Sequence, residues 1–154
     1  MRRAVLALAL LATPLLAQEA TPVPRVAISP RGAEEIAVGP GRMRVEYGRP
    51  FAKGRKIFGE LVPWGKVWRT GANEATSLTT DVDVTLGNVA LPKGSYTLYT
   101  LPGEKEWLLI VNRQTGQWGT EYDPKLDLAR IPMKSATRPD LLEAMTISFL
   151  PEDA

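Results

Sequence analysis

The feature that most constrains this chain is hydrophobic alternation with a period of two, in short runs separated by turn sequences. In residues 42–47 every second side chain is apolar or aromatic, and the side chains between them are charged. This period places successive side chains on opposite faces of a β-strand. Further strand patterns, alternating or continuously apolar, are found at residues 76–80, 82–86, 96–101, 107–111 and 145–149.

Turn sequences fall between these runs and point to the same fold class. Strands spaced by about 8–12 residues with short turns indicate an antiparallel sandwich or barrel. The one helical candidate is short, at residues 140–145. The sequence therefore predicts an all-β fold, a single antiparallel β-sandwich of immunoglobulin-like or jelly-roll-like type with a long basic and aromatic loop. The turns are Gly87-Asn88, Pro92-Lys93-Gly94, Pro102-Gly103 and Thr115-Gly116.

The N-terminus has the layout of a secretory signal peptide. Arg2 and Arg3 precede an apolar run that begins at Ala4, and the small residue Ala17 ends it. That run has 14 residues, fewer than the roughly 20 that a membrane-spanning helix needs. We predict a signal at residues 1–17 that is cleaved after Ala17, a secreted or periplasmic protein, and no transmembrane anchor after cleavage.

The rest of the chain divides into a lead-in and one domain. Residues 18–31 contain Pro22, Pro24 and Pro30 and are predicted to form an extended lead-in. Residues 32–154 then form the single β-sandwich domain. A domain of this size buries about two thirds of the surface that its unfolded chain exposes, so it needs no disulfide or metal to fold.

The absence of two residue types excludes several classes of chemistry. The chain has no His and no Cys, which excludes thiol nucleophiles, triads that use His, and zinc sites built from imidazole or thiolate. The carboxylates Glu121, Asp123 and Asp127 lack the spacing of the helix-loop-helix calcium site. No metal and no cofactor is predicted.

The overall charge argues against nucleic acid as a partner. Of the 19 basic residues, Arg2 and Arg3 belong to the predicted signal, so the mature chain has 17 basic and 17 acidic residues. A neutral exported protein has no general electrostatic affinity for nucleic acid or an anionic membrane.

One segment differs from this neutral background. Residues 42–69 hold eight basic side chains against Glu46 and Glu60, with five aromatic residues interleaved. Residues 49–66 within it are predicted to form a loop, which is long because connections in compact domains usually have about 4–6 residues. Long ordered loops often carry function.

This segment and the residues after it supply the candidate ligand-binding residues. Arg presents a planar fork to anions or hydroxyl groups, aromatic rings provide flat apolar walls, and an adjacent amide and carboxylate can orient a ligand. The candidates are Tyr47, Arg49, Arg55, Trp64, Trp68, Arg69, Asn73 and Glu74.

Several functions stay open at this level. The candidates favour a small anionic or hydroxyl-rich, carbohydrate-like ligand. Alternatively, the arginines pair with acidic residues and the chain is a purely structural envelope protein. A third possibility is a hydrolase that acts on an envelope glycan or ester with Glu74 as acid or base. Glycoside hydrolysis generally needs two carboxylates, and the sequence marks only one, so binding is favoured over catalysis.

Three blocks carry a family resemblance, in order along the chain. Residues 47–76 (YGRPFAKGRKIFGELVPWGKVWRTGANEAT), 91–112 (LPKGSYTLYTLPGEKEWLLIVN) and 117–131 (QWGTEYDPKLDLARI) closely resemble the bacterial family called domain of unknown function 2911. The resemblance runs from about Ser29 to Leu150. It implies a secreted or periplasmic single domain with a β-sandwich fold. It implies no activity, and it transfers no site residues.

Overall fold

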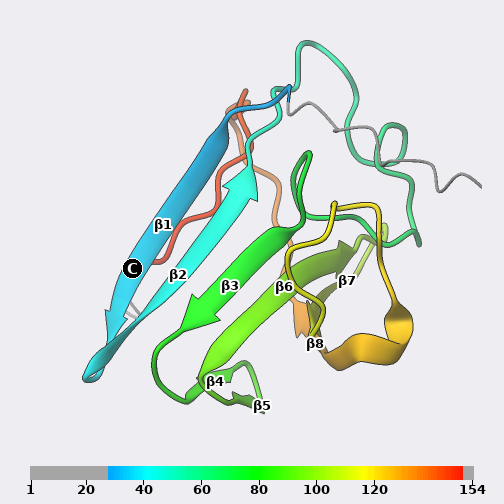
Figure 1. Ribbon diagram of the computed structural model, residues 1–154. Helices are drawn as coiled ribbons and strands as arrows, with labels where there is room; N and C mark the ends of the chain where they lie inside the picture. Colours follow the sequence, from blue (N-terminus) through cyan, green and yellow to red (C-terminus); the bar gives the residue numbers. More distant parts are fainter. Residues whose placement is uncertain (1–27, 151–154) are drawn as a thin grey trace, which may run out of the picture.

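The computed structural model of the protein describes residues 28–150. The predicted signal and most of the predicted lead-in therefore lie outside the described residues. The described chain is all-β, as the sequence predicts, and has eight strands and one short 3-10 turn (Figure 1). The helical candidate at residues 140–145 forms no helix. No helix in this part of the chain is long and apolar enough to cross a bilayer.

Six strands form one antiparallel sheet in the order β1-β2-β3-β6-β7-β8, and β4 and β5 form a separate two-stranded sheet. The prediction of antiparallel sheet is confirmed. The finer prediction of a sandwich of immunoglobulin-like or jelly-roll-like type stays a prediction. The elements are β1 (Arg31–Val38), β2 (Gly41–Gly48), β3 (Thr76–Thr80), β4 (Val84–Leu86), β5 (Val89–Leu91), β6 (Gly94–Leu101), β7 (Trp107–Asn112), the 3-10 turn (Pro124–Leu126) and β8 (Asp127–Met133).

The core lies against one face of the large sheet. Register explains which side chains meet there: Val45 on β2 is opposite Leu78 on β3, and Leu98 on β6 is opposite Val111 on β7. Burial of each such side chain stabilises the fold by about 1.5–3 kcal/mol. The β4–β5 hairpin and the C-terminal segment cover this face, because the side chains packed against the core include Val84, Leu86, Val89, Ile147 and Phe149.

The C-terminal segment differs from the sequence prediction. Residues 145–149 alternate like a strand, yet they join no sheet ladder. In Figure 1 this segment, coloured red, runs behind β1 and β2 rather than beside a sheet edge. The backbone of Ile147 bonds instead to a side chain: its N–H donates to the Tyr47 hydroxyl at 2.9 Å, and that hydroxyl donates to its carbonyl at 3.3 Å.

Three strands were not predicted from the sequence: β1, β5 and β8. The two longer ones, β1 and β8, are the edge strands of the large sheet. β1 is mostly exposed on both faces, so its sequence has no clear alternation. β8 carries Pro132, which is tolerated because an edge strand has one side without ladder partners. β1 begins at Arg31, the last residue of the predicted lead-in.

Candidate functional site

A groove opens at one end of the sheet, with a volume of about 1040 Å³. Its walls come from parts of the chain that are far apart in sequence: the connection between β2 and β3, residues Tyr99, Gly119, Thr120 and Tyr122, and residues 142–146. The connection, residues 49–75, supplies most of the lining. The basic and aromatic segment is therefore part of a concave surface.

Trp68 shapes this connection by taking a ladder position in the sheet. The register between β3 and β6 pairs Thr76 with Leu98, so a continued β3 would place residue 74 opposite Thr100. Trp68 lies there instead: its N–H donates to the Thr100 carbonyl at 2.8 Å, and the Thr100 N–H donates back at 2.9 Å. Residues 69–75 consequently leave the sheet as an excursion.

The excursion is held by unusual backbone conformations and by buried hydroxyl groups. Thr70 and Asn73 have positive φ angles of 53° and 64°. Asn tolerates this region, whereas a β-branched Thr is strained there. The Thr70 hydroxyl contacts that of Thr100 at 3.2 Å, and Thr76 donates to the Thr70 carbonyl at 2.8 Å. These contacts keep the strained turn in place.

The excursion brings Arg69 into the groove lining. Its Nε donates to the Gly71 carbonyl at 3.3 Å. Its side-chain stem packs against Gly119, where a Cβ would collide with it. Within residues 28–150 it forms no ion pair with a carboxylate.

Arg55 lines another part of the groove and is held by backbone carbonyls. Its Nε donates to Ala52 at 2.9 Å, and a terminal nitrogen donates to Phe51 at 2.7 Å. Carbonyl groups orient the guanidinium without neutralising its charge. Lys53 is the third cation of the lining, and Glu143, which accepts the Lys53 backbone N–H at 2.8 Å, is the one carboxylate. Charge in the groove is therefore positive.

Aromatic rings form part of the groove walls. Phe58 and Trp68 meet edge-to-face with ring centroids 5.8 Å apart, and Tyr99 and Tyr122 do so at 4.9 Å. Burial raises the pKa of Tyr99, and it raises the pKa of Tyr122 together with the hydrogen bond to Asp127. Both phenols are therefore neutral at physiological pH and add no negative charge to the groove.

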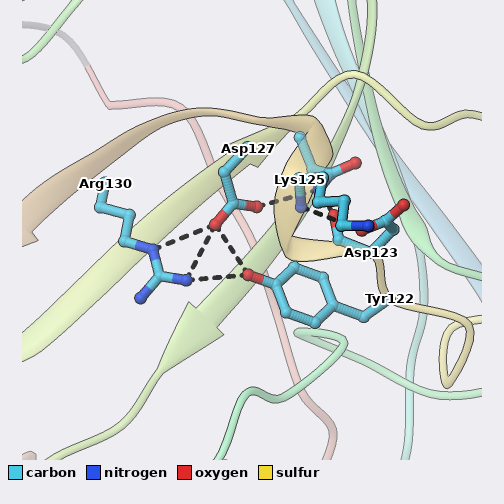
Figure 2. Close-up of polar contacts among 6 residues, drawn as sticks. Tyr122, Asp123, Lys125, Asp127 and Arg130 are labelled. Atoms are coloured by element: carbon cyan, nitrogen blue, oxygen red, sulfur yellow. Dashed lines mark hydrogen bonds and ion pairs between the residues drawn. The ribbon is translucent and has the colours of Figure 1, made fainter.

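Tyr122 is fixed from behind by a polar network, which Figure 2 shows. Its hydroxyl donates to Asp127 Oδ2 at 2.7 Å, and Arg130 donates to the same oxygen at 2.9 and 3.0 Å. Asn112, which is fully buried, donates to the other carboxylate oxygen at 2.9 Å. These bonds set the direction of the Tyr122 ring at the groove wall.

The acidic stretch before β8 is thus engaged in structural contacts. Asp123 accepts the Lys125 backbone N–H at 2.9 Å and caps the 3-10 turn, while Asp127 belongs to the network just described. Within the described residues no three or more acidic side chains gather in a way that could hold a metal ion.

Four of the eight candidate residues line the groove: Arg55, Trp68, Arg69 and Asn73. Asn73 is only 3% exposed, and its amide is already engaged. Its Nδ2 donates to the Ser29 carbonyl at 3.1 Å, and its Oδ1 accepts the Ile28 N–H at 3.4 Å. It therefore ties the start of the described chain to the excursion.

The other four candidates lie outside the lining. Tyr47 is buried in the core. Arg49 holds the C-terminal segment by donating to the Met145 carbonyl at 3.1 Å and the Thr146 hydroxyl at 3.2 Å. Trp64 packs near Phe58 and Trp107, with centroids 6.2 and 6.4 Å away. Glu74 forms a half-exposed ion pair with Arg31 at 3.0 Å, rather than pairing with Arg69.

Sequence reasoning missed Lys53, Phe58, Tyr99, Tyr122 and Glu143 as lining residues. The first two belong to the basic and aromatic segment, whose composition was the available signal. The other three come from β6, from the stretch before the 3-10 turn and from the C-terminal segment. No local pattern shows that these segments meet at one end of the sheet.

Comparisons with known proteins agree with the family resemblance. The family model described as "Protein of unknown function (DUF2911)" matches residues 29–154. No curated protein and no solved structure matches the chain at a significant level.

Proposed function

The chain belongs to the DUF2911 family, and we propose that its groove binds a small anionic ligand through Arg55 and Arg69. The ligand presents a carboxylate, phosphate or sulfate group to these two side chains. We place this activity outside the cytoplasm, a proposal that the signal-like pattern of residues 1–17 supports.

The observation that carries the proposal is the unbalanced charge of the groove. Three cationic side chains and one carboxylate line it. The arginines that do form ion pairs within the described chain all lie outside the lining: Arg31, Arg42, Arg44 and Arg130. A concave surface with an excess of positive charge concentrates anions, and a guanidinium binds them through parallel hydrogen bonds.

Binding is better supported than hydrolysis. Glu74, the residue proposed as acid or base, is paired with Arg31 and is not part of the groove lining. A hydroxyl-rich, carbohydrate-like ligand stays compatible with the flat wall that the half-buried Trp68 provides. The positive charge favours an acidic sugar over a neutral one.

The test is a thermal-shift and calorimetric titration of the purified full chain with phosphate, sulfate, glucuronate and glucose. Anions that bind the folded state raise its melting temperature in proportion to RT ln(1 + [L]/Kd). We expect this rise to shrink at least threefold in Arg69→Gln and Arg55→Gln.

Arg44→Gln is the matched control, because Arg44 is paired with Glu35 and Glu46 away from the groove. It should respond to the anions as the unaltered chain does. Equal responses in all three variants would mean that the anions act on general surface charge, and the proposed site would be lost.

A further inference from the structure

The groove lining is more apolar than a site for a small hydrophilic anion requires. Thirteen of its 25 lining residues are apolar and four are charged. A free phosphate or sugar acid would cover the cationic part and leave most of the apolar wall in water. Ligand sites match the polarity of what they hold, because uncovered apolar surface contributes nothing to affinity.

Several large apolar side chains at the groove are also strongly exposed. Phe51 is 40% exposed, Phe58 38%, Leu61 55% and Leu142 51%, and all four line the groove. They come from two segments about 80 residues apart in the chain that meet where Phe51 pairs with Ala144. Exposed apolar side chains that gather in one concave surface mark a binding groove rather than scattered surface residues.

Apolar and cationic side chains share this one concavity. The Arg55 guanidinium donates a hydrogen bond to the backbone carbonyl of Phe51, so a cation lies beside one of the exposed apolar residues. Lys53 and Arg69 line the same groove. The complementary molecule has a negative head and an apolar body.

We infer that the ligand is a single-chain anionic amphiphile, such as an alkyl carboxylate or alkyl phosphate, an inference that rests on the proposed anion site. Its head contacts Arg55 and Arg69, and its alkyl chain lies along Phe58, Leu61 and Leu142. The volume of about 1040 Å³ slightly exceeds the usual range for small-molecule pockets, about 300–1,000 Å³, which leaves room for a chain beyond the head group.

The test is a calorimetric titration of the full chain with butyrate, hexanoate, octanoate and decanoate, each below its micelle-forming concentration. We expect the affinity to rise about fourfold with each methylene that becomes buried. Octyl glucoside, which has an eight-carbon chain and no charge, should bind at least tenfold more weakly than octanoate.

Two leucines that are adjacent in the chain provide the matched control. Leu142 lines the groove, whereas Leu141 is 77% exposed and does not. Leu142→Ser should weaken octanoate at least threefold and leave butyrate unchanged, while Leu141→Ser should change neither. Both positions are exposed enough that neither variant should unfold the chain.

The outcomes separate the two proposals. Binding of butyrate or phosphate that depends on Arg69 but does not grow with chain length would refute the amphiphile and leave the anion site intact. If Arg69→Gln binds every one of these ligands as tightly as the unaltered chain does, both the anion site and the amphiphile are refuted. Binding to vesicles of equal parts phosphatidylglycerol and phosphatidylcholine, without any binding of free octanoate, would refute the single-chain ligand in favour of a membrane surface.

Discussion

Tyr47→Phe tests how the C-terminal segment is held on the sheet. Tyr47 is 1% exposed, and its hydroxyl serves both backbone groups of Ile147, one at 2.9 Å and one at 3.3 Å. Phe retains the ring, so the change removes two hydrogen bonds without opening a large cavity. Each bond contributes about 0.5–1.5 kcal/mol, and Ile147 is partly buried, so water replaces them incompletely. We expect a loss of about 2 kcal/mol.

The expected shift in melting temperature follows from the size of the folded part. An unfolding entropy of about 2.1 cal/mol/K per residue over roughly 120 residues makes 1 kcal/mol equal to about 4 °C. Tyr47→Phe should therefore lower the melting temperature by about 8 °C. Urea unfolding should show a lower midpoint with a similar slope.

Tyr96→Phe is the control for this prediction. Tyr96 is 8% exposed, and its hydroxyl donates one local hydrogen bond, to the Pro92 carbonyl at 2.7 Å. It should lose about 1 kcal/mol. Hydrogen exchange at residues 145–149 should accelerate only in Tyr47→Phe. Unchanged stability and unchanged protection of that segment in Tyr47→Phe would refute the reasoning.

Three further changes probe the groove and its surroundings. Glu74→Gln breaks an exposed ion pair, so the free energy of unfolding should fall by less than about 1 kcal/mol and anion binding should persist. A loss of anion binding would mean that Glu74 contributes to the site. Gly119→Ala places a methyl group against Arg69, so the free energy of unfolding measured in urea should fall by about 1–3 kcal/mol. Calorimetry should also show weaker anion binding. An unchanged stability would contradict the packing of Arg69 on Gly119. Burial raises the pKa of Tyr99 and Tyr122, so the folded state favours the neutral phenols. Their contribution to the free energy of unfolding is complete below pH 10 and is lost as the pH rises through the raised pKa values. Melting curves and 295 nm absorbance from pH 9 upward check this, and ionisation at or below pH 10 would disagree with it.

Strand prediction succeeded for strands in the interior of the sheet. The interior strands β3 and β7 were predicted almost to the residue, because nearly all of their side chains are buried or partly buried, Thr79 being the exception. β1 was missed because an exposed edge strand has no apolar face to reveal it. Residues 145–149 show the opposite failure: the pattern of a strand is present, but its backbone partner is the Tyr47 hydroxyl.

The candidate site divides in the same way. Composition alone indicates that residues 42–69 hold an excess of cations and aromatic rings, and Arg55, Trp68 and Arg69 do line the groove. Pairing could not be inferred, because Glu74 meets Arg31 from the start of β1 rather than its sequence neighbour Arg69.

Local sequence therefore determined the fold class and the kind of chemistry that is present, since alternation and residue types are local properties. Tertiary structure decided which side chains share a surface. Trp68 takes the ladder position opposite Thr100, and that one pairing turns residues 69–75 out of the sheet. A ladder pairing depends on the competition among all strands for hydrogen-bond partners, and this competition is settled only when the whole sheet has formed.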